Sequence, residues 1–66
     1  MITENIEMLC KKNGISVSGL EKTLGFGNST ISKWANSSPT AEKLIAVSDY
    51  FNVSIDYLLY GEDKRR

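Results

Sequence analysis

The residues of this chain that are best suited to chemistry lie in one short segment, LGFGNSTISKW, residues 24–34. Its two glycines, Gly25 and Gly27, raise the possibility of a loop that cradles a phosphate group. A dinucleotide-binding fingerprint requires Gly-x-Gly-x-x-Gly after a strand, but Thr30 occupies the sixth position here and the preceding segment has helical spacing. The chain also lacks the Gly-Lys-Ser/Thr of a P-loop. The glycines therefore indicate a tight corner between two helices.

The polar run that follows the corner has side chains of the kind that read DNA bases. At about 100° per residue, Ile31, Trp34 and Ala35 are expected on one face of a third helix and the polar residues on the opposite face, with Trp34 in the core. Asparagine can pair with adenine through two hydrogen bonds, and lysine can donate to guanine. An ordinary solvated face is the alternative. The residues expected to read bases are Asn28, Ser29, Ser32 and Lys33.

Residue types that support catalysis or metal binding are scarce. The sequence has no histidine, and its single cysteine, Cys10, cannot hold zinc alone. It has no nucleophile motif and no pair of carboxylates framed by a pocket. Cys10 itself lies on an apolar helical stripe and is expected to be a small core residue. We therefore expect no enzymatic activity, no catalytic residue, no metal, no cofactor and no small-molecule ligand.

Charge and length narrow the class of protein further. The net charge of the 66 residues is zero, but five lysines against two glutamates make the stretch from Cys10 to Lys43 net positive. Such asymmetry can give a neutral protein one basic face. No run approaches the roughly 20 apolar residues that a membrane span needs. With one unpaired cysteine and no signal sequence, we expect a cytoplasmic, nucleoid-associated protein.

Helical spacing recurs along the chain and strand signals are scarce, so we expect an all-α fold of five short helices. One domain is expected over residues 1–61, followed by a charged tail, residues 62–66, with no reason to be ordered. The stability of so small a domain is marginal, and dimerisation would help it. The helices are expected between these boundary residues: Ile2 and Gly14, Ser16 or Ser18 and Gly25, Gly27 and Asn36, Thr40 and Asn52, and Ser54 and Gly61.

Nearly the whole chain, from the first helix to Gly61, resembles the Cro/phage-repressor-type helix-turn-helix domain of the xenobiotic-response-element family. The most specific segments are LGFGNSTISKW, SPTAEKL and YFNVSIDYLL. The resemblance implies a compact five-helix lambda-repressor-like domain, with the helix-turn-helix at helices two and three. It also implies binding to double-stranded operator DNA, usually as a symmetric dimer. The chain departs from the family at Val17, usually glutamine, at Glu21, usually a small residue, at Gly27, usually serine or threonine, and at Ser37, usually glycine.

The resemblance also suggests where the DNA backbone is touched. Lys43 lies near the start of the fourth expected helix, beside Ser37, Ser38 and Thr40, where the family contacts phosphates. Val17 cannot make the contact of the usual glutamine, which leaves backbone N–H groups at that helix end for the task. The residues expected to contact phosphates are Ser16, Ser18, Thr30, Asn36, Ser38 and Lys43.

The last expected helix has more apolar surface than a helix of less than two turns can bury. Tyr57, Leu58, Leu59 and Tyr60 are consecutive, so part of this cluster should face outward. With Leu58 directed inward, we expect Tyr57, Leu59 and Tyr60 to form the interface of a weak homodimer. The alternative is that these side chains merely cover the core of their own domain.

The function favoured by the sequence is that of a DNA-binding transcriptional repressor of phage or prophage type. It would bind a palindromic operator as a dimer, through the major groove. Two alternatives stay open. In the first, the chain would be the isolated DNA-binding domain of a longer repressor. In the second, it would be a protein-interaction adaptor that kept the fold without DNA affinity.

Overall fold

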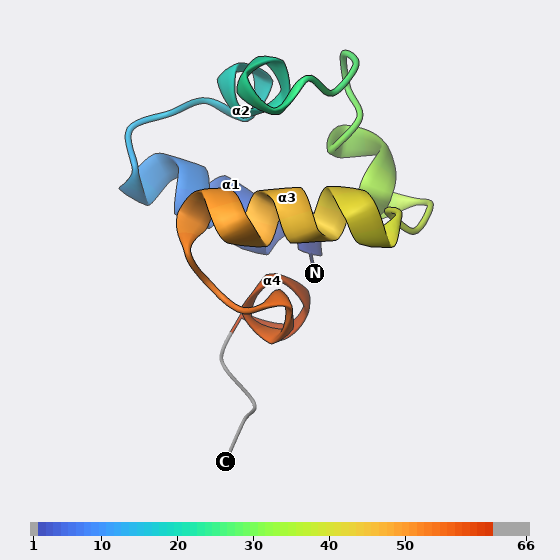
Figure 1. The fold of residues 1–66 in the computed structure, drawn as a ribbon. Helices are drawn as coiled ribbons and strands as arrows, with labels where there is room; N and C mark the ends of the chain where they lie inside the picture. The colour runs from blue at the N-terminus through green and yellow to red at the C-terminus, as the bar shows by residue number, and fades with distance from the viewer. Residues whose placement is uncertain (1, 62–66) are drawn as a thin grey trace.

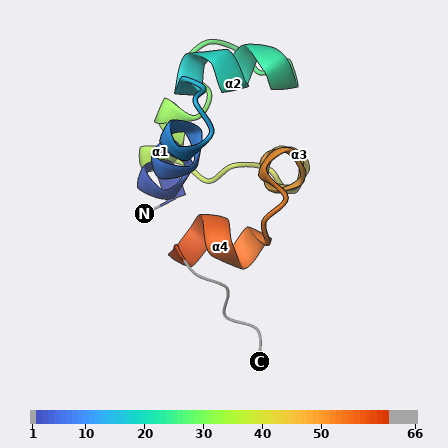
Figure 2. The same ribbon diagram turned by 90° about the vertical axis from the view of Figure 1, so that its left-hand side faces the viewer.

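The computed structural model describes residues 2–61, which are helical and contain no strand. The elements are α1 (Ile2–Lys12), α2 (Val17–Leu24), the 3-10 helix η1 (Ser32–Ala35), α3 (Ala41–Phe51) and α4 (Ile55–Tyr60). Helices α2 and α4 lie at opposite ends of the molecule, with α1 and α3 between them (Figures 1 and 2). The expected charged tail, residues 62–66, lies outside the described residues.

Three hydroxyl side chains begin the helices after α1, as the sequence predicts. Ser16 accepts a hydrogen bond from the Gly19 N–H. Thr40 accepts one from the Lys43 N–H, and Ser54 accepts one from the Tyr57 N–H. Each satisfies one of the N–H groups that a helix start leaves without a partner. Of the two candidates for the α2 cap, the structure therefore has Ser16 and not Ser18.

Helix α1 is the element on which the others assemble, because α2, η1 and α4 all pack against it. Half-buried side chains such as Leu44 and Phe51 of α3 complete this core. Trp34 and Cys10 are buried, which confirms the core role expected for both. The core consists of Ile6, Leu9, Cys10, Leu20, Ile31, Trp34, Val47 and Leu58.

The five-helix count is not confirmed, because the structure has four α-helices and one short 3-10 helix over residues 2–61. The third segment does not begin as an α-helix at Gly27. The carbonyl of Gly27 accepts hydrogen bonds from the Thr30 N–H at 3.3 Å and the Thr30 hydroxyl at 2.7 Å, which closes a turn. Ser29 has φ of +63°, in the left-handed region, and an α-helix cannot continue through that conformation. Regular structure resumes only at Ser32.

No helix within residues 2–61 is long and apolar enough to cross a membrane. The same part of the chain has no cluster of three or more histidine, cysteine, aspartate or glutamate side chains that could hold a metal ion.

Candidate nucleic-acid interface

The glycine corner between α2 and the following segment is built as the sequence predicts. Gly25 has φ of +76°, and its N–H donates to the carbonyls of Glu21 and Lys22. The Phe26 N–H donates to the Glu21 carbonyl at 2.8 Å, which completes the hydrogen-bond pattern of a helix stop with a left-handed residue. Phe26 is half-buried against the core, with its ring centroid 6.1 Å from that of Trp34. The chain is thereby redirected with an apolar anchor beneath the bend.

The segment after the corner presents its polar residues to solvent, although it is not an α-helix. Ile31 and Trp34 are buried, as expected. Residues three apart lie on one face in both 3-10 and α geometry, so this part of the prediction does not depend on the helix type. Ala35 is exposed and the expectation for it is wrong, because a residue four positions after Ile31 shares its face only in an α-helix. The exposed residues are Asn28, Ser29, Ser32, Lys33 and Asn36.

A buried carboxylate, that of Glu21, holds this segment in place. Glu21 is only 5% exposed, and its Oε1 and Oε2 accept hydrogen bonds from the backbone N–H groups of Ser29 (3.2 Å) and Ile31 (2.9 Å). Burying a carboxylate is costly unless hydrogen bonds replace its water, and these two do so. The sequence showed that Glu21 departs from the family's usual small residue, but no local pattern links it to partners eight and ten positions away.

Three of the expected base-reading residues meet the start of α2 in one surface depression. This depression has a volume of about 430 Å³ and combines Ser18, expected to contact phosphate, with the exposed polar segment. Val17 of α2 and the buried Glu21 form the rest of its wall. Lys33 is not part of it. The residues that line it are Val17, Ser18, Glu21, Asn28, Ser29 and Ser32.

Lys33 lies instead beside residues expected to contact phosphates. A second depression of about 220 Å³ contains Lys33, Thr30, Ser38 and Lys43, and so spans the loop between η1 and α3. The Lys43 ammonium lies 5.7 Å from the centroid of the Phe26 ring, within the range of a cation–π contact. Two positive charges thus flank one depression, next to the one lined by Asn28 and the serines.

Two of the hydroxyl groups expected to contact phosphates already form hydrogen bonds within the protein, one as an acceptor and the other as a donor. The Ser16 oxygen accepts from Gly19, so its proton remains available to donate to a phosphate. The Thr30 hydroxyl donates its proton to the Gly27 carbonyl at 2.7 Å. Thr30 can donate to a phosphate only if this bond breaks, so its side chain stabilises the turn in the described structure.

The comparisons with known proteins agree with this geometry. The family model described as Helix-turn-helix matches residues 6–58. The chain belongs to the Cro/C1-type helix-turn-helix family. This confirms the resemblance drawn from the sequence, and membership of the family indicates a DNA-binding transcription regulator. The comparisons with curated proteins and with solved structures found no match.

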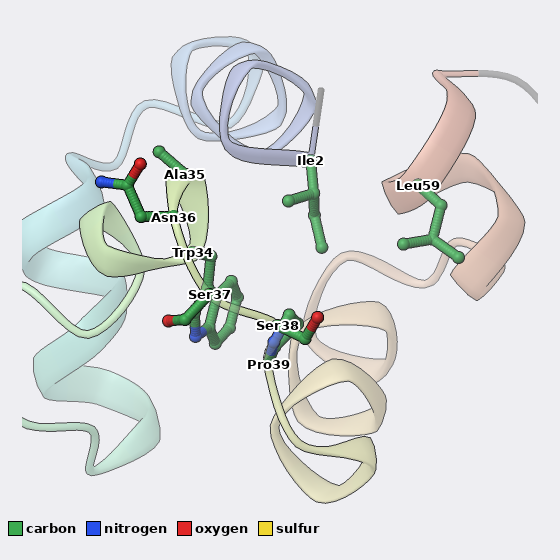
Figure 3. Close-up of a pocket in the computed structure, with 8 residues that line it drawn as sticks. All are labelled: Ile2, Trp34, Ala35, Asn36, Ser37, Ser38, Pro39 and Leu59. Atoms are coloured by element: carbon green, nitrogen blue, oxygen red, sulfur yellow. The ribbon is translucent and has the colours of Figure 1, made fainter.

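The apolar residues of α4 that were expected at a dimer interface differ in how far they are exposed. Tyr57 is half-buried against the core, whereas Leu59 and Tyr60 are 37% and 62% exposed. Leu59 borders a third depression, of about 310 Å³, to which Ile2 contributes from α1 (Figure 3). The opposite wall comes from Trp34, Asn36 and the loop that ends at Pro39. Of the residues expected at a dimer interface, Leu59 and Tyr60 are therefore exposed, whereas Tyr57 is only partly exposed.

Proposed function

We propose that residues 1–61 form the DNA-binding domain of a cytoplasmic phage or prophage-type repressor, which binds a palindromic operator through the major groove as a dimer. The observation that supports this most is the depression where the start of α2 meets Asn28, Ser29 and Ser32. Base-reading groups and a phosphate-contacting helix start must lie side by side if one domain is to contact both parts of a duplex.

The base-reading part of the proposal rests on exposed side chains of suitable chemistry. Asn28, Ser29 and Ser32 line the depression at α2, and Lys33 projects beside them into the neighbouring one. An asparagine amide matches adenine and a lysine ammonium matches guanine, while the short serines allow close approach to the groove floor.

The phosphate-contacting part of the proposal places DNA backbone on both sides of these readers. Ser16 and Ser18 lie at the start of α2, and Asn36, Ser38 and Lys43 extend from η1 to α3. Thr30 is the weakest member of this set, since its hydroxyl proton is donated to Gly27. Few basic residues are involved, so we expect about 3–5 neutralised phosphates per subunit and a shallow salt dependence.

Dimerisation is proposed through the exposed end of α4, and Leu59 and Tyr60 are its main candidates. Tyr57 contributes at most its exposed edge, because it packs against the domain's own core. A two-fold pair formed there would bring the reading segments toward successive major grooves, about 34 Å apart. Leu59→Glu should leave a folded monomer that no longer binds the operator cooperatively. Unchanged cooperativity in this variant would reject the interface.

The test of the proposal is selection of bound duplexes from a random pool, followed by mobility shifts on the selected sequence. Asn28→Ala and Lys33→Ala should each weaken binding by about 1–3 kcal/mol and relax the preference at one base position. Lys12→Ala removes an exposed lysine of α1 and controls for the loss of charge alone. Failure of the parent protein to retain any duplex in a salt-sensitive manner would instead support a protein-interaction adaptor.

Lys43 separates phosphate contact from base reading. Lys43→Ala should weaken binding to all sequences alike and reduce the slope of log K against log salt by about one per subunit. If the loss were confined to one base position, Lys43 would be a base reader and the proposed phosphate set would be wrong.

A further inference from the structure

The hydrogen bonds of Glu21 fix a segment that has few other restraints. Residues Asn28 and Ser29 are exposed, and Ile31 is the first side chain after Phe26 that is anchored fully in the core. The segment between them is held by the turn that Thr30 closes on Gly27, by the bond from the Lys33 N–H to the Ser29 carbonyl, and by the two N–H bonds to the Glu21 carboxylate. Within residues 2–61, the hydrogen bonds that tie this turn to α2 are those to Glu21.

The conformation that Glu21 holds is one the segment would not adopt by itself. Ser29 is in the left-handed region at φ of +63°, which costs a residue with a Cβ roughly 1–2 kcal/mol. Such a conformation persists only where the surroundings determine it. The carboxylate supplies that restraint, because its bonds to the N–H groups of Ser29 and Ile31 require the chain to turn between them.

The same two bonds decide which groups of the segment remain for DNA. N–H groups at the start of a helical segment attract phosphates when no other anion reaches them. Here the Glu21 carboxylate accepts from the N–H groups of Ser29 and Ile31, so these donors are already used inside the protein. The side chains of Asn28, Ser29 and Ser32, which line the depression above Glu21, are left as the groups that face a duplex.

We propose that Glu21 is a positioning residue for base reading. By accepting the N–H groups of Ser29 and Ile31, it holds the turn in the form that directs the side chains of Asn28 and Ser29 toward base edges. Glu21 does not itself contact DNA. The inference rests on the proposed function and adds to it a residue of α2 that governs sequence preference from beneath the reading segment.

The test compares two variants that each lose one carboxylate. In Glu21→Gln one carboxylate oxygen becomes an NH₂ group, which faces an N–H donor and cannot accept its hydrogen bond. Glu7→Gln removes an exposed carboxylate from α1 and serves as the matched control. Both are measured, alongside the parent, on the selected operator, on operators with single base changes, and on unrelated duplex.

For Glu21→Gln we expect discrimination against the changed operators to fall by about tenfold at the base position whose preference Asn28→Ala relaxes, with affinity for unrelated duplex retained. Glu7→Gln should discriminate as the parent does. A folded Glu21→Gln protein with full discrimination would overturn the role of Glu21 but not the proposed function. An equal loss on all duplexes would also overturn it, because a merely structural role predicts a uniform loss. A parent that selects no sequence overturns the proposed function and this inference with it.

Amide hydrogen exchange in the parent protein keeps the inference testable if Glu21→Gln does not fold. The Ser29 and Ile31 amides should be protected from exchange without DNA, since their partner lies inside the protein. Exchange at the rate of an open loop, with protection appearing only when operator is added, would show that DNA orders the turn and would overturn the inference.

Discussion

The chain contains two units in which a helix, a corner and a second helical segment follow one another, and they are stabilised differently. In the first, α2 ends at Gly25 and leads to η1; in the second, α3 ends at Asn52 and leads to α4. Both first helices end on a left-handed residue, and both begin at a hydroxyl cap. The second unit restarts at once, because Ser54 caps α4 two residues after Asn52. The first restarts only after a turn that a distant carboxylate holds.

The two units differ in how the second helical segment is held, because one segment packs in the core and the other follows a turn exposed to solvent. In the second unit, α4 begins where the Ser54 side chain accepts the Tyr57 N–H, and α4 then packs on α1. The turn in the first unit leaves Asn28 and Ser29 exposed, so they add no core packing. Beside the local bonds of Thr30 to Gly27, the turn is held by the carboxylate of Glu21. An exposed polar turn held from beneath suits a surface that must keep its shape while it binds a partner.

The largest effects should come from the core that the two units share. Leu20 of the first unit and Leu58 of the second are both fully buried. Leu20→Ala and Leu58→Ala should each lower the free energy of unfolding by about 3 kcal/mol, enough to unfold much of so small a domain. Urea denaturation followed by circular dichroism measures both. A loss below about 1 kcal/mol for either would mean that its unit is not part of one cooperative core.

The helix caps should show that both units obey the same local rule. Ser16→Ala and Ser54→Ala each remove an acceptor from a helix start and should cost about 1 kcal/mol. Ser18→Ala is the control for Ser16, since Ser18 is an exposed serine of α2 that is not its cap. Thermal denaturation distinguishes them. If Ser18→Ala were as costly as Ser16→Ala, the assigned cap would be wrong.

These caps also mark how far the sequence predicts the structure. Thr40 and Ser54 were predicted, and Ser16 was one of two candidates beside Ser18, because a cap and its partner lie three residues apart in the sequence. Helix ends at Gly25 and Gly61 were predicted because glycine readily adopts the left-handed conformation that ends a helix, and both residues have it. The buried faces of the α-helices follow from spacing, whereas the spacing misplaced Ala35 of the 3-10 helix.

What the sequence did not predict depends on contacts between distant positions. The turn at residues 28–31 was expected to be α-helical because the polar and apolar spacing fits an α-helix, but Ser29 and the bonds to Glu21 override it. The candidate site was predicted as one polar face. Its division into a depression at α2 and another at Lys43 depends on how the loop after η1 packs, which helical periodicity does not describe.

Within residues 2–61, two residues other than glycine have a left-handed backbone conformation, and we expect them to respond differently to substitution by glycine. Ser29 and Asn52 have φ of +63° and +58°, but asparagine tolerates this region better than serine. Ser29→Gly should stabilise the domain by about 0.5–1 kcal/mol after the greater freedom of glycine in the unfolded chain is subtracted. Asn52→Gly should change stability by less than about 0.5 kcal/mol. Chemical denaturation of both variants tests this, and a larger gain at Asn52 would refute the idea that strain is concentrated in the first unit.

The smallest expected effect on stability comes from Cys10 of α1, the helix against which segments of both units pack. Burial, and to a lesser extent the charge of Glu7, raises the pKa of the thiol above its ordinary value of 9.0. The pKa is raised only in the folded state, where the buried thiol stays protonated. The free energy of unfolding therefore contains a contribution from this thiol that is fully present below its ordinary pKa and is lost as pH rises through the folded pKa. Stability of the parent should therefore decline above pH 9 slightly more than that of Cys10→Ala. Parallel decline in denaturation curves of the two proteins would contradict the shift.

The most direct test of the central claim, that the first unit and not the second contacts DNA bases, is an NMR titration of ¹⁵N-labelled protein with its selected operator. We predict that the largest amide shifts fall at the start of α2 and over residues 28–38, with smaller shifts at α4, the proposed dimer interface. Shifts confined to α4, with residues 28–36 unchanged, would contradict the claim and identify the exposed polar segment as an ordinary solvated surface.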